Sequence, residues 1–245
     1  MANPFKDINE LDRDVNSFLK NNRSFLANQT KRISDYFEMF CYNNILRFYE
    51  AAGWEISIKN LKKNKFKYKC TTMGNPDNFS YFLMSKSQAK GKKTVTLCYW
   101  IYHNMNIQSA YHADIFTTPD IAIITPGSIR VSTTFYLTKR KYYYVENKDL
   151  ITFGEAKNFT PFPELLFNFI GVVNELKPKC LKKSKKTGEH IAPSLLVSGK
   201  ANQHAQKIKD SLETRYDINI LFDLFSIGNS TFSRSLQHRL KKIGF

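Results

Sequence analysis

Two short stretches decide the expected fold of this chain: residues 119–124 read Pro-Asp-Ile-Ala-Ile-Ile, and residues 153–157 read Phe-Gly-Glu-Ala-Lys. An acidic residue opens the first apolar run and a Glu-x-Lys closes the second, and both runs predict β-strands. Alternate side chains of a strand share a face, so Glu155 and Lys157 point the same way. If Asp120 lies beside them, two carboxylates and an ammonium meet, which is a minimal set for metal-assisted hydrolysis of a phosphodiester.

The same residues allow a plainer interpretation, in which an exposed Glu-Lys pair lies on a strand edge and the aspartate belongs to a turn. The separation of the two stretches also weighs against their pairing, since Asp120 and Glu155 lie 155 − 120 = 35 positions apart. That interval leaves room for an extra hairpin. Asp114, in the segment that precedes the first stretch, is the alternative first carboxylate.

Bulk composition indicates a folded, basic protein. A length of 245 residues favours one domain with elaborations, and the 20 Phe and 13 Tyr argue against disorder. The net charge of +16 favours a polyanionic partner such as nucleic acid, although a lysine-rich proteome would also produce it. Four widely spaced cysteines without zinc spacing, and no apolar run of membrane-spanning length, lead us to expect a cytoplasmic protein that does not bind membranes.

The remaining periodicity predicts an alternation of helices and strands. Helices are expected near 5–30, 34–53, 163–177 and 202–216, and strands near 55–58, 94–101, 120–125, 128–137, 141–146, 151–157, 192–197 and 218–225. Residues 71–93 are expected to form a loop or hairpin insertion, and residues 230–245 a short basic helix.

Glu38 lies on an otherwise apolar stripe of the helix expected over 34–53. An ionised carboxylate that faces a core is costly unless a partner compensates it, and a metal or Lys157 would serve. The alternative is that Glu38 lies at the exposed border of the stripe.

The pattern Pro119, Asp120, Glu155, Lys157 resembles the PD-(D/E)xK superfamily of nucleases, over roughly residues 34–225. The resemblance implies an α/β, restriction-endonuclease-like αβββαβ core with a mixed central sheet. We therefore expect three parts: an N-terminal helical arm (1–33), the nuclease-like domain (34–225) and a C-terminal basic helix (226–245).

The resemblance also implies a function, a Mg²⁺-dependent endonuclease acting on DNA in restriction or antiviral defence, with Mn²⁺ as a substitute cofactor. Asp120, Glu155 and the Ala156 carbonyl would hold the metal, Lys157 would orient the attacking water, and Glu38 would be an extra catalytic carboxylate. Because two carboxylates about 4 Å apart repel by on the order of 4 kcal/mol at an effective dielectric of 20, we expect metal-free Asp120→Ala to be at least as stable as the native protein.

Several basic side chains are candidate contacts to the nucleic-acid backbone. Lysines alternate with other residues over 63–70, which predicts an amphipathic strand whose basic face either follows phosphates or is simply solvated. The candidate contacts are Lys63, Lys65, Lys67, Lys139, Arg140, Lys182 and Lys183. A non-catalytic nucleic-acid-binding subunit with the same fold is the alternative function, and a second copy of the chain or a regulatory protein remains a candidate partner.

Overall fold

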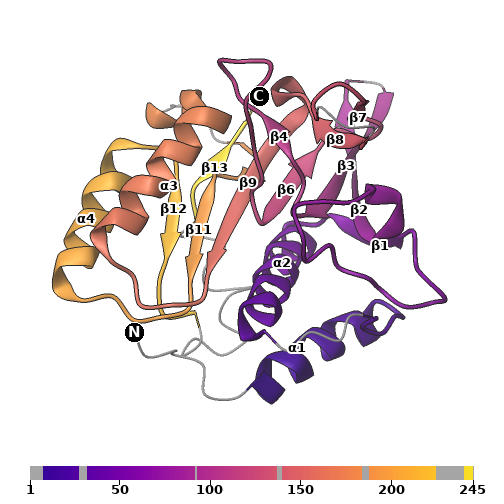
Figure 1. Ribbon diagram of the computed structural model, residues 1–245, viewed down its shortest axis with the longest axis horizontal. Helices are drawn as coiled ribbons and strands as arrows, with labels where there is room; N and C mark the ends of the chain where they lie inside the picture. The colour runs from indigo at the N-terminus through magenta and orange to yellow at the C-terminus, as the bar shows by residue number, and fades with distance from the viewer. Residues whose placement is uncertain are drawn as a thin grey trace.

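The fold is built on a seven-stranded mixed sheet, seen in Figure 1, in a computed structural model that describes residues 8–27, 32–91, 93–136, 140–183, 188–224 and 240–244. In spatial order the strands are β1 (Glu55–Lys59), β2 (Tyr81–Lys90), β3 (Lys93–His103), β6 (Ile121–Ile124), β9 (Leu150–Lys157), β11 (Ser194–Val197) and β12 (Asn219–Leu221). The pairs β9–β11 and β11–β12 are parallel and the others are antiparallel. Strand β9, at the junction of the two halves, is buried along nearly its whole length.

Two smaller sheets complete the strands. The first has the order β5 (Phe116–Thr117), β4 (Ile107–Gln108), β8 (Tyr142–Val145) and β7 (Ile129–Ser132), and the second pairs β10 (His190–Ile191) with β13 (Lys242–Ile243). All strands of the first lie between β3 and β9 in sequence. Of these strands, β7 and β8 occupy the long interval between the two deciding stretches.

Helices cover both faces of the main sheet. α1 (Ile8–Asn21) and α2 (Ile33–Ala51) share a core with one face, while α3 (Pro163–Leu176) and α4 (Gln203–Arg215) pack on the other (Figure 1). Short 3-10 helices occupy Pro76–Asn78, Asn147–Asp149 and Pro178–Leu181. No helix in these described segments combines the length and apolar character that crossing a membrane would need.

The close approach of α2 to β9 depends on a residue without a side chain. A Cβ at Gly154 would lie 3.0 Å from Cδ1 of Ile45, so the helix packs directly on the strand at this point. This contact fixes α2 beside the strand that carries Glu155 and Lys157.

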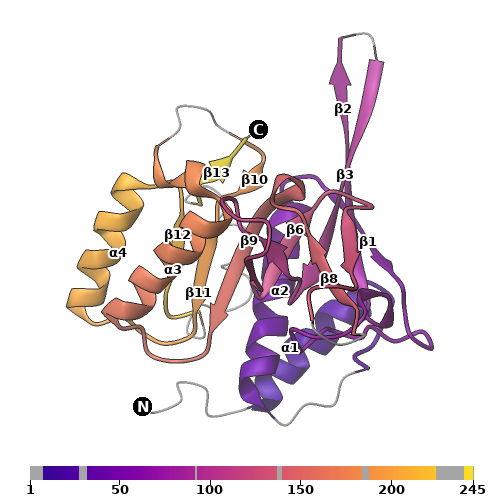
Figure 2. The ribbon, with the colours of Figure 1, turned by 45° about the horizontal axis from the view of Figure 1, so that its top comes forward.

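The helices and strands predicted from a clear hydrophobic period are confirmed, whereas segments with an ambiguous pattern differ from the prediction. The helices expected at 34–53, 163–177 and 202–216 are α2, α3 and α4. The strands predicted outside residues 63–70 are present, although the one expected over 128–137 is only Ile129–Ser132 and the last ends at Leu221. The insertion expected over 71–93 contains β2, which pairs with β3 in a hairpin that extends beyond the sheet (Figure 2).

The lysine-rich strand predicted over 63–70 is wrong. Lys63 and Asn64 adopt left-handed backbone conformations with φ of 51° and 59°, and Lys62 bridges Lys65 across them. A tight turn of this kind breaks an extended strand, so the lysines do not form a continuous face. Lys69 is buried instead, and its ammonium donates to the carbonyls of Thr71 and Asn104.

The expected chain ends are only partly described. The predicted N-terminal arm contains α1, whose apolar side chains belong to the same core as α2. Most of the predicted C-terminal helix, residues 225–239 and 245, lies outside the described residues. The part that is described, 240–244, contains strand β13 and not a helix.

Candidate active site

The register between β6 and β9 places Asp120 directly opposite Glu155. Ile121 pairs with Gly154 and Ala122 with Phe153. Continuing that antiparallel register by one position joins Asp120 to Glu155, and directly opposite residues project their side chains from the same face of the sheet. The separation of 35 positions in sequence thus becomes a distance of one strand spacing.

Lys157 joins the two carboxylates. Its Nζ donates to Oδ2 of Asp120 at 2.9 Å and to Oε2 of Glu155 at 2.8 Å. Lys157 lies two residues after Glu155 on β9, so alternation puts both side chains on the face that Asp120 also uses. The predicted meeting of these three side chains is therefore present.

The main chain of β9 also contacts Asp120. The Ala156 N–H donates to Oδ2 of Asp120 at 2.6 Å. The N–H and C=O of one residue in a strand point toward the same neighbour, so the Ala156 carbonyl also faces the edge at which Asp120 lies. Asp120 is therefore both a charged group of the site and the hydrogen-bond acceptor of a buried amide.

Burial makes these charges interdependent. The side chains of Asp120 and Glu155 are each 11% exposed and that of Lys157 is 32% exposed, so the site opens to solvent on the lysine side. Burial, followed by repulsion from Asp120 and opposed by Lys157, raises the pKa of Glu155 to about 8. Burial alone would lower the pKa of Lys157, but the Glu155 and Asp120 carboxylates outweigh it and raise that pKa above its usual value.

The donor set fits a hard divalent cation. Asp120 and Glu155 supply carboxylate oxygens and Ala156 a carbonyl oxygen on the same edge, and these are the ligand types that Mg²⁺ takes, with water completing its octahedron. Burial and the neighbouring Asp120 raise the pKa of Glu155, so a bound cation would offset negative charge that this site otherwise disfavours. Within the described segments, however, no three His, Cys, Asp or Glu side chains group as a metal centre, so water and substrate oxygens would have to supply the other ligands.

Glu38 has different partners from those expected. Its Oε2 lies 3.3 Å from Nε2 of His103 and accepts a hydrogen bond from Nδ2 of Asn104 at 3.5 Å. Its side chain is 21% exposed, which fits a position at the edge of the buried stripe. The expected pairing of Glu38 with Lys157 is not observed, because Lys157 is held by Asp120 and Glu155.

Sequence reasoning missed His103 and Asn104, which connect Glu38 to the site. The main-chain N–H of Asn104 donates to the carbonyl of Asp120 at 2.9 Å. The only signal in the sequence was their place at the end of a strongly predicted strand, which does not reveal the strand's neighbours.

Asp114 is not the first carboxylate of the site. It is exposed, and its main-chain N–H donates to Nδ1 of His112 in a turn between β4 and β5. Asp120, at the start of β6, occupies the position beside Glu155 and Lys157.

The candidate backbone contacts lie in separate places. Lys63 and Lys65 are exposed at the tight turn, and Lys67 is half-buried with its ammonium 5.1 Å from the centre of the Phe79 ring. Arg140 is exposed just before β8, and Lys139 lies outside the described residues.

Lys182 and Lys183 are exposed beyond the C-terminal end of α3. That helix of 14 residues starts soon after Lys157 and is about 21 Å long at 1.5 Å per residue. The two lysines therefore lie at the opposite end of the helix from the site, and their role as phosphate contacts stays a prediction.

Comparison with known proteins adds no relative: no family, no curated protein sequence and no solved structure matches this chain. The functional argument therefore depends on the geometry of the site.

Proposed function

We propose that this chain is a divalent-cation-dependent endonuclease that hydrolyses phosphodiester bonds in DNA. The observation that carries the proposal is the Lys157 ammonium, which hydrogen-bonds Asp120 and Glu155 at the end of β9. Two carboxylates, a carbonyl oxygen and an amine at one solvent-accessible position are the groups that such chemistry requires.

The proposal includes a restriction-endonuclease-like fold. In its support, the elements α2, β3, β6, β9, α3 and β11 occur in the order αβββαβ once the intervening strands β1, β2, β4, β5, β7, β8 and β10 are set aside. β3, β6 and β9 form an antiparallel meander, β11 adds to it in parallel, and α2 and α3 pack on opposite faces. The chemistry-bearing residues stand on the two adjacent strands β6 and β9, where the resemblance to PD-(D/E)xK nucleases would put them.

Each residue has a distinct part in the proposed reaction. Bound Mg²⁺ would polarise the scissile phosphate and acidify a coordinated water. Asp120 and Glu155 provide the negative charge that holds the ion, and Glu155 must release its proton to do so. Lys157, which stays charged, holds the attacking water and offsets the charge that develops on the phosphate oxygens.

DNA as the substrate is supported by charge. The chain has 37 Lys and Arg against 21 Asp and Glu, and such an excess draws a polyanion and raises the rate of encounter. A role in restriction or defence stays an expectation of the resemblance.

The test is nicking of a supercoiled plasmid in Mg²⁺ or in EDTA. We expect the native protein to nick only with Mg²⁺, and Lys157→Met to lose about 10²- to 10³-fold in rate, as for other groups that stabilise transition-state charge. Lys209→Met is the matched control, because Lys209 is also ion-paired, to Glu213 at 2.8 Å, but lies on α4. Plasmid binding without Mg²⁺-dependent nicking would instead favour a non-catalytic DNA-binding subunit.

A further inference from the structure

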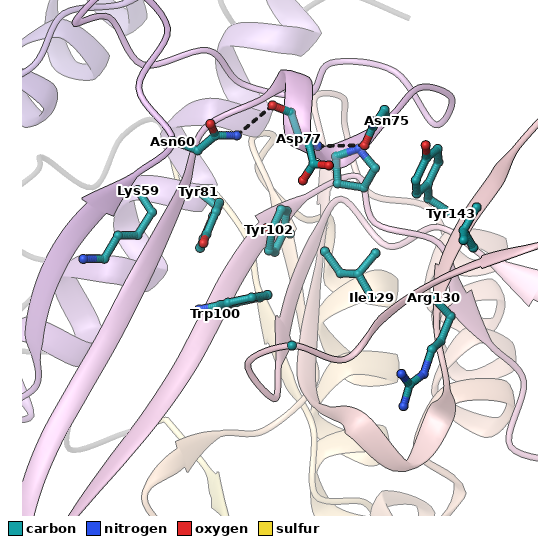
Figure 3. A pocket seen from close by; sticks show the side chains of 13 residues that line it. Lys59, Asn60, Asn75, Asp77, Tyr81, Trp100, Tyr102, Ile129, Arg130 and Tyr143 are labelled. Atoms are coloured by element: carbon teal, nitrogen blue, oxygen red, sulfur yellow. Dashed lines mark hydrogen bonds between the residues drawn. The ribbon is translucent and has the colours of Figure 1, made fainter.

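A cleft lies on the face of the main sheet that also carries the candidate active site. It is a cleft of about 660 Å³ between the start of β2, the end of β3 and the hairpin strand β7 (Figure 3). Its volume falls within the range of about 300–1,000 Å³ that small-molecule sites occupy. None of the residues discussed so far as catalytic lines it.

The floor of the cleft is aromatic. Tyr81 and Tyr102 are stacked, with ring centroids 4.6 Å apart and an interplanar angle of 16°, and Trp100 lies 5.0 Å from Tyr81. Tyr102 is buried and supports the other two, whereas Tyr81 and Trp100 are half-buried and line the open side. A platform of this kind matches the flat face of a nucleobase.

Cations stand on either side of the platform and a carboxylate stands above it. Figure 3 shows Lys59 on one side of the rings and Arg130 on the other, with the Asp77 side chain directed toward the rings. The main chain of Asp77 is used in its own turn, by Asn75 and Asn60. Its carboxylate remains an acceptor for the amino group of a base, the pairing by which carboxylates read cytosine.

The platform shares a sheet face with the candidate active site. Tyr102 pairs with Ala122 across β3 and β6, and both belong to the core on the α3 side of the sheet. Asp120 precedes Ala122 by two positions, so its side chain is on that face as well. Tyr102 thus lies one strand across and two residues along from Asp120, at about 8 Å, and Trp100 lies one strand across and four residues along, at about 14 Å.

These separations correspond to about two to four nucleotides at 3.4 Å per step. A row of side chains also crosses the sheet toward the site: Lys59 pairs with Tyr81 on the neighbouring strand, and Tyr102 follows on β3. A nucleic-acid strand laid along this row would meet a cation and then the stacked rings, and beyond Tyr102 the row continues into the buried Ala122.

We propose that the cleft binds an unpaired nucleobase of the substrate strand, a few nucleotides from the phosphate that is cleaved. Trp100 and Tyr81 stack on the base, Asp77 accepts a hydrogen bond from its amino group, and Lys59 and Arg130 contact the flanking phosphates. The inference rests on the proposed function, because the ligand is the strand on which the site acts.

Binding is measured without cleavage, in EDTA, by the fluorescence anisotropy of a labelled single-stranded oligodeoxycytidylate. The chain has two tryptophans, and Trp54 is buried at 3% exposure, so a Trp54→Phe protein reports on Trp100 alone. We expect the oligonucleotide to quench Trp100 emission. We expect Trp100→Ala to weaken binding about 5- to 150-fold, the range for loss of one base stack, and Trp100→Phe to weaken it less.

Arg130 and Lys148 form a matched pair of test and control, and substituting either one leaves the hydrophobic core unchanged. Arg130 and Lys148 both pair with Glu146, but only Arg130 lines the cleft. Arg130→Ala should weaken binding and lower the salt dependence by about one phosphate contact, whereas Lys148→Ala should do neither. Asp77→Asn should weaken binding of oligodeoxycytidylate more than that of oligodeoxythymidylate, which lacks the amino group.

Three outcomes would overturn the inference: unquenched Trp100 emission on oligonucleotide binding, equal effects of Arg130→Ala and Lys148→Ala, or quenching by dCMP without binding of the oligonucleotide. The last would mean that the cleft takes free nucleotides. Failure of the proposed function is seen separately, as absence of Mg²⁺-dependent plasmid nicking in a protein that still shows the Trp100 response.

Discussion

Removing the side chain of Asp120 should destabilise the metal-free protein, whereas replacing it with asparagine should not. Asp120 accepts the buried N–H of Ala156 at 2.6 Å and an ammonium hydrogen bond from Lys157 at 2.9 Å, both on Oδ2. Asp120→Ala deletes the oxygen that accepts both hydrogen bonds. Asp120→Asn keeps an acceptor oxygen, and Lys157 keeps its bond to Glu155.

The magnitude follows from these contacts. A buried N–H left without a partner costs about 1–3 kcal/mol, and a hydrogen bond to a charged group contributes about 1.5–3 kcal/mol. Because Lys157 is 32% exposed and retains Glu155, we discount its loss and expect Asp120→Ala to lose about 2–3 kcal/mol. Relief of repulsion offsets only part of this loss, because the raised pKa of Glu155 reduces the negative charge that it carries beside Asp120.

The loss of these hydrogen bonds predicts the opposite of what charge alone predicts, namely that metal-free Asp120→Ala would be at least as stable as the native protein. Urea unfolding in EDTA at pH 7, followed by circular dichroism, measures the difference, which corresponds to a change of about 4–12 °C in Tm for a chain of this size. Asp120→Asn should stay within about 1 kcal/mol of the native protein. Equal stability of the native protein and Asp120→Ala would refute the argument, and equal losses in the two variants would show that charge, not the acceptor, matters.

Three further predictions test the surroundings of the site. Gly154→Ala should lower the free energy of unfolding by about 1–3 kcal/mol, because the added Cβ overpacks against Cδ1 of Ile45. Ile45→Val removes that atom, so the double variant should recover part of the loss. Additive losses of the two substitutions in urea unfolding would contradict this. Since the raised pKa of Glu155 makes the folded state hold a proton that the unfolded state releases, the free energy of unfolding in EDTA should fall as pH rises from about 4.5 to 8, by up to about 1.4 kcal/mol per pH unit. The window from about pH 6.5 to 7 isolates this effect, because His190, whose pKa burial lowers to about 4, acts with the opposite sign only below 6.5. Lys69 and Lys177, whose pKa values burial lowers to about 8, act with the opposite sign as the pH approaches 8. An unchanged slope in Glu155→Gln would contradict the assignment. Glu38→Gln should keep the rate of Mg²⁺-dependent nicking within a few-fold of the native rate, because the amide oxygen still accepts the hydrogen bond from Asn104. A loss of rate as large as that of Lys157→Met would make Glu38 a metal ligand.

Elements with strong local periodicity could be predicted from the sequence. The stripe of α3 and the apolar runs of β6 and β9 are properties of neighbouring residues, so they survive in the fold. α2 is also a helix where its period predicts one, but it is buried around most of its circumference and not along one stripe. The hairpin strand β2 carried no such signal. Its outer half pairs only with the equally exposed start of β3, so burial imposes no apolar alternation on it.

In the lysine run over 63–70 the sequence has the pattern of a strand, but the structure has no strand there. Its alternation predicted a strand, but the left-handed conformations at Lys63 and Asn64 turn the chain, and burial of Phe66 and Tyr68 alone accounts for the pattern. Alternation over a few residues does not reveal whether the backbone stays extended. A two-residue turn within the run was enough to remove the expected basic face.

The site itself was predictable in residue types but not in geometry. Glu155 and Lys157 share a face because they are two apart on one strand, which sequence alone provides. Their meeting with Asp120 depends on the β6–β9 register, in which Ile121 opposes Gly154. A shift of that register by one residue would turn the Asp120 side chain to the opposite face, so the site exists only through pairing that no local pattern encodes.

The contacts of Glu38 likewise depend on which strands lie side by side in the sheet. Its carboxylate contacts His103 and Asn104 at the end of β3, and the Asn104 N–H holds the carbonyl of Asp120. A carboxylate on the apolar face of α2 thus acts on the segment that places Asp120, at the end of the sheet where β3, β6 and β9 meet. The cost of keeping this acidic group at the border of the core is compensated by the hydrogen bond from Asn104 and the nearby imidazole of His103, which makes Glu38 a positioning residue whose effect reaches Asp120 through the backbone.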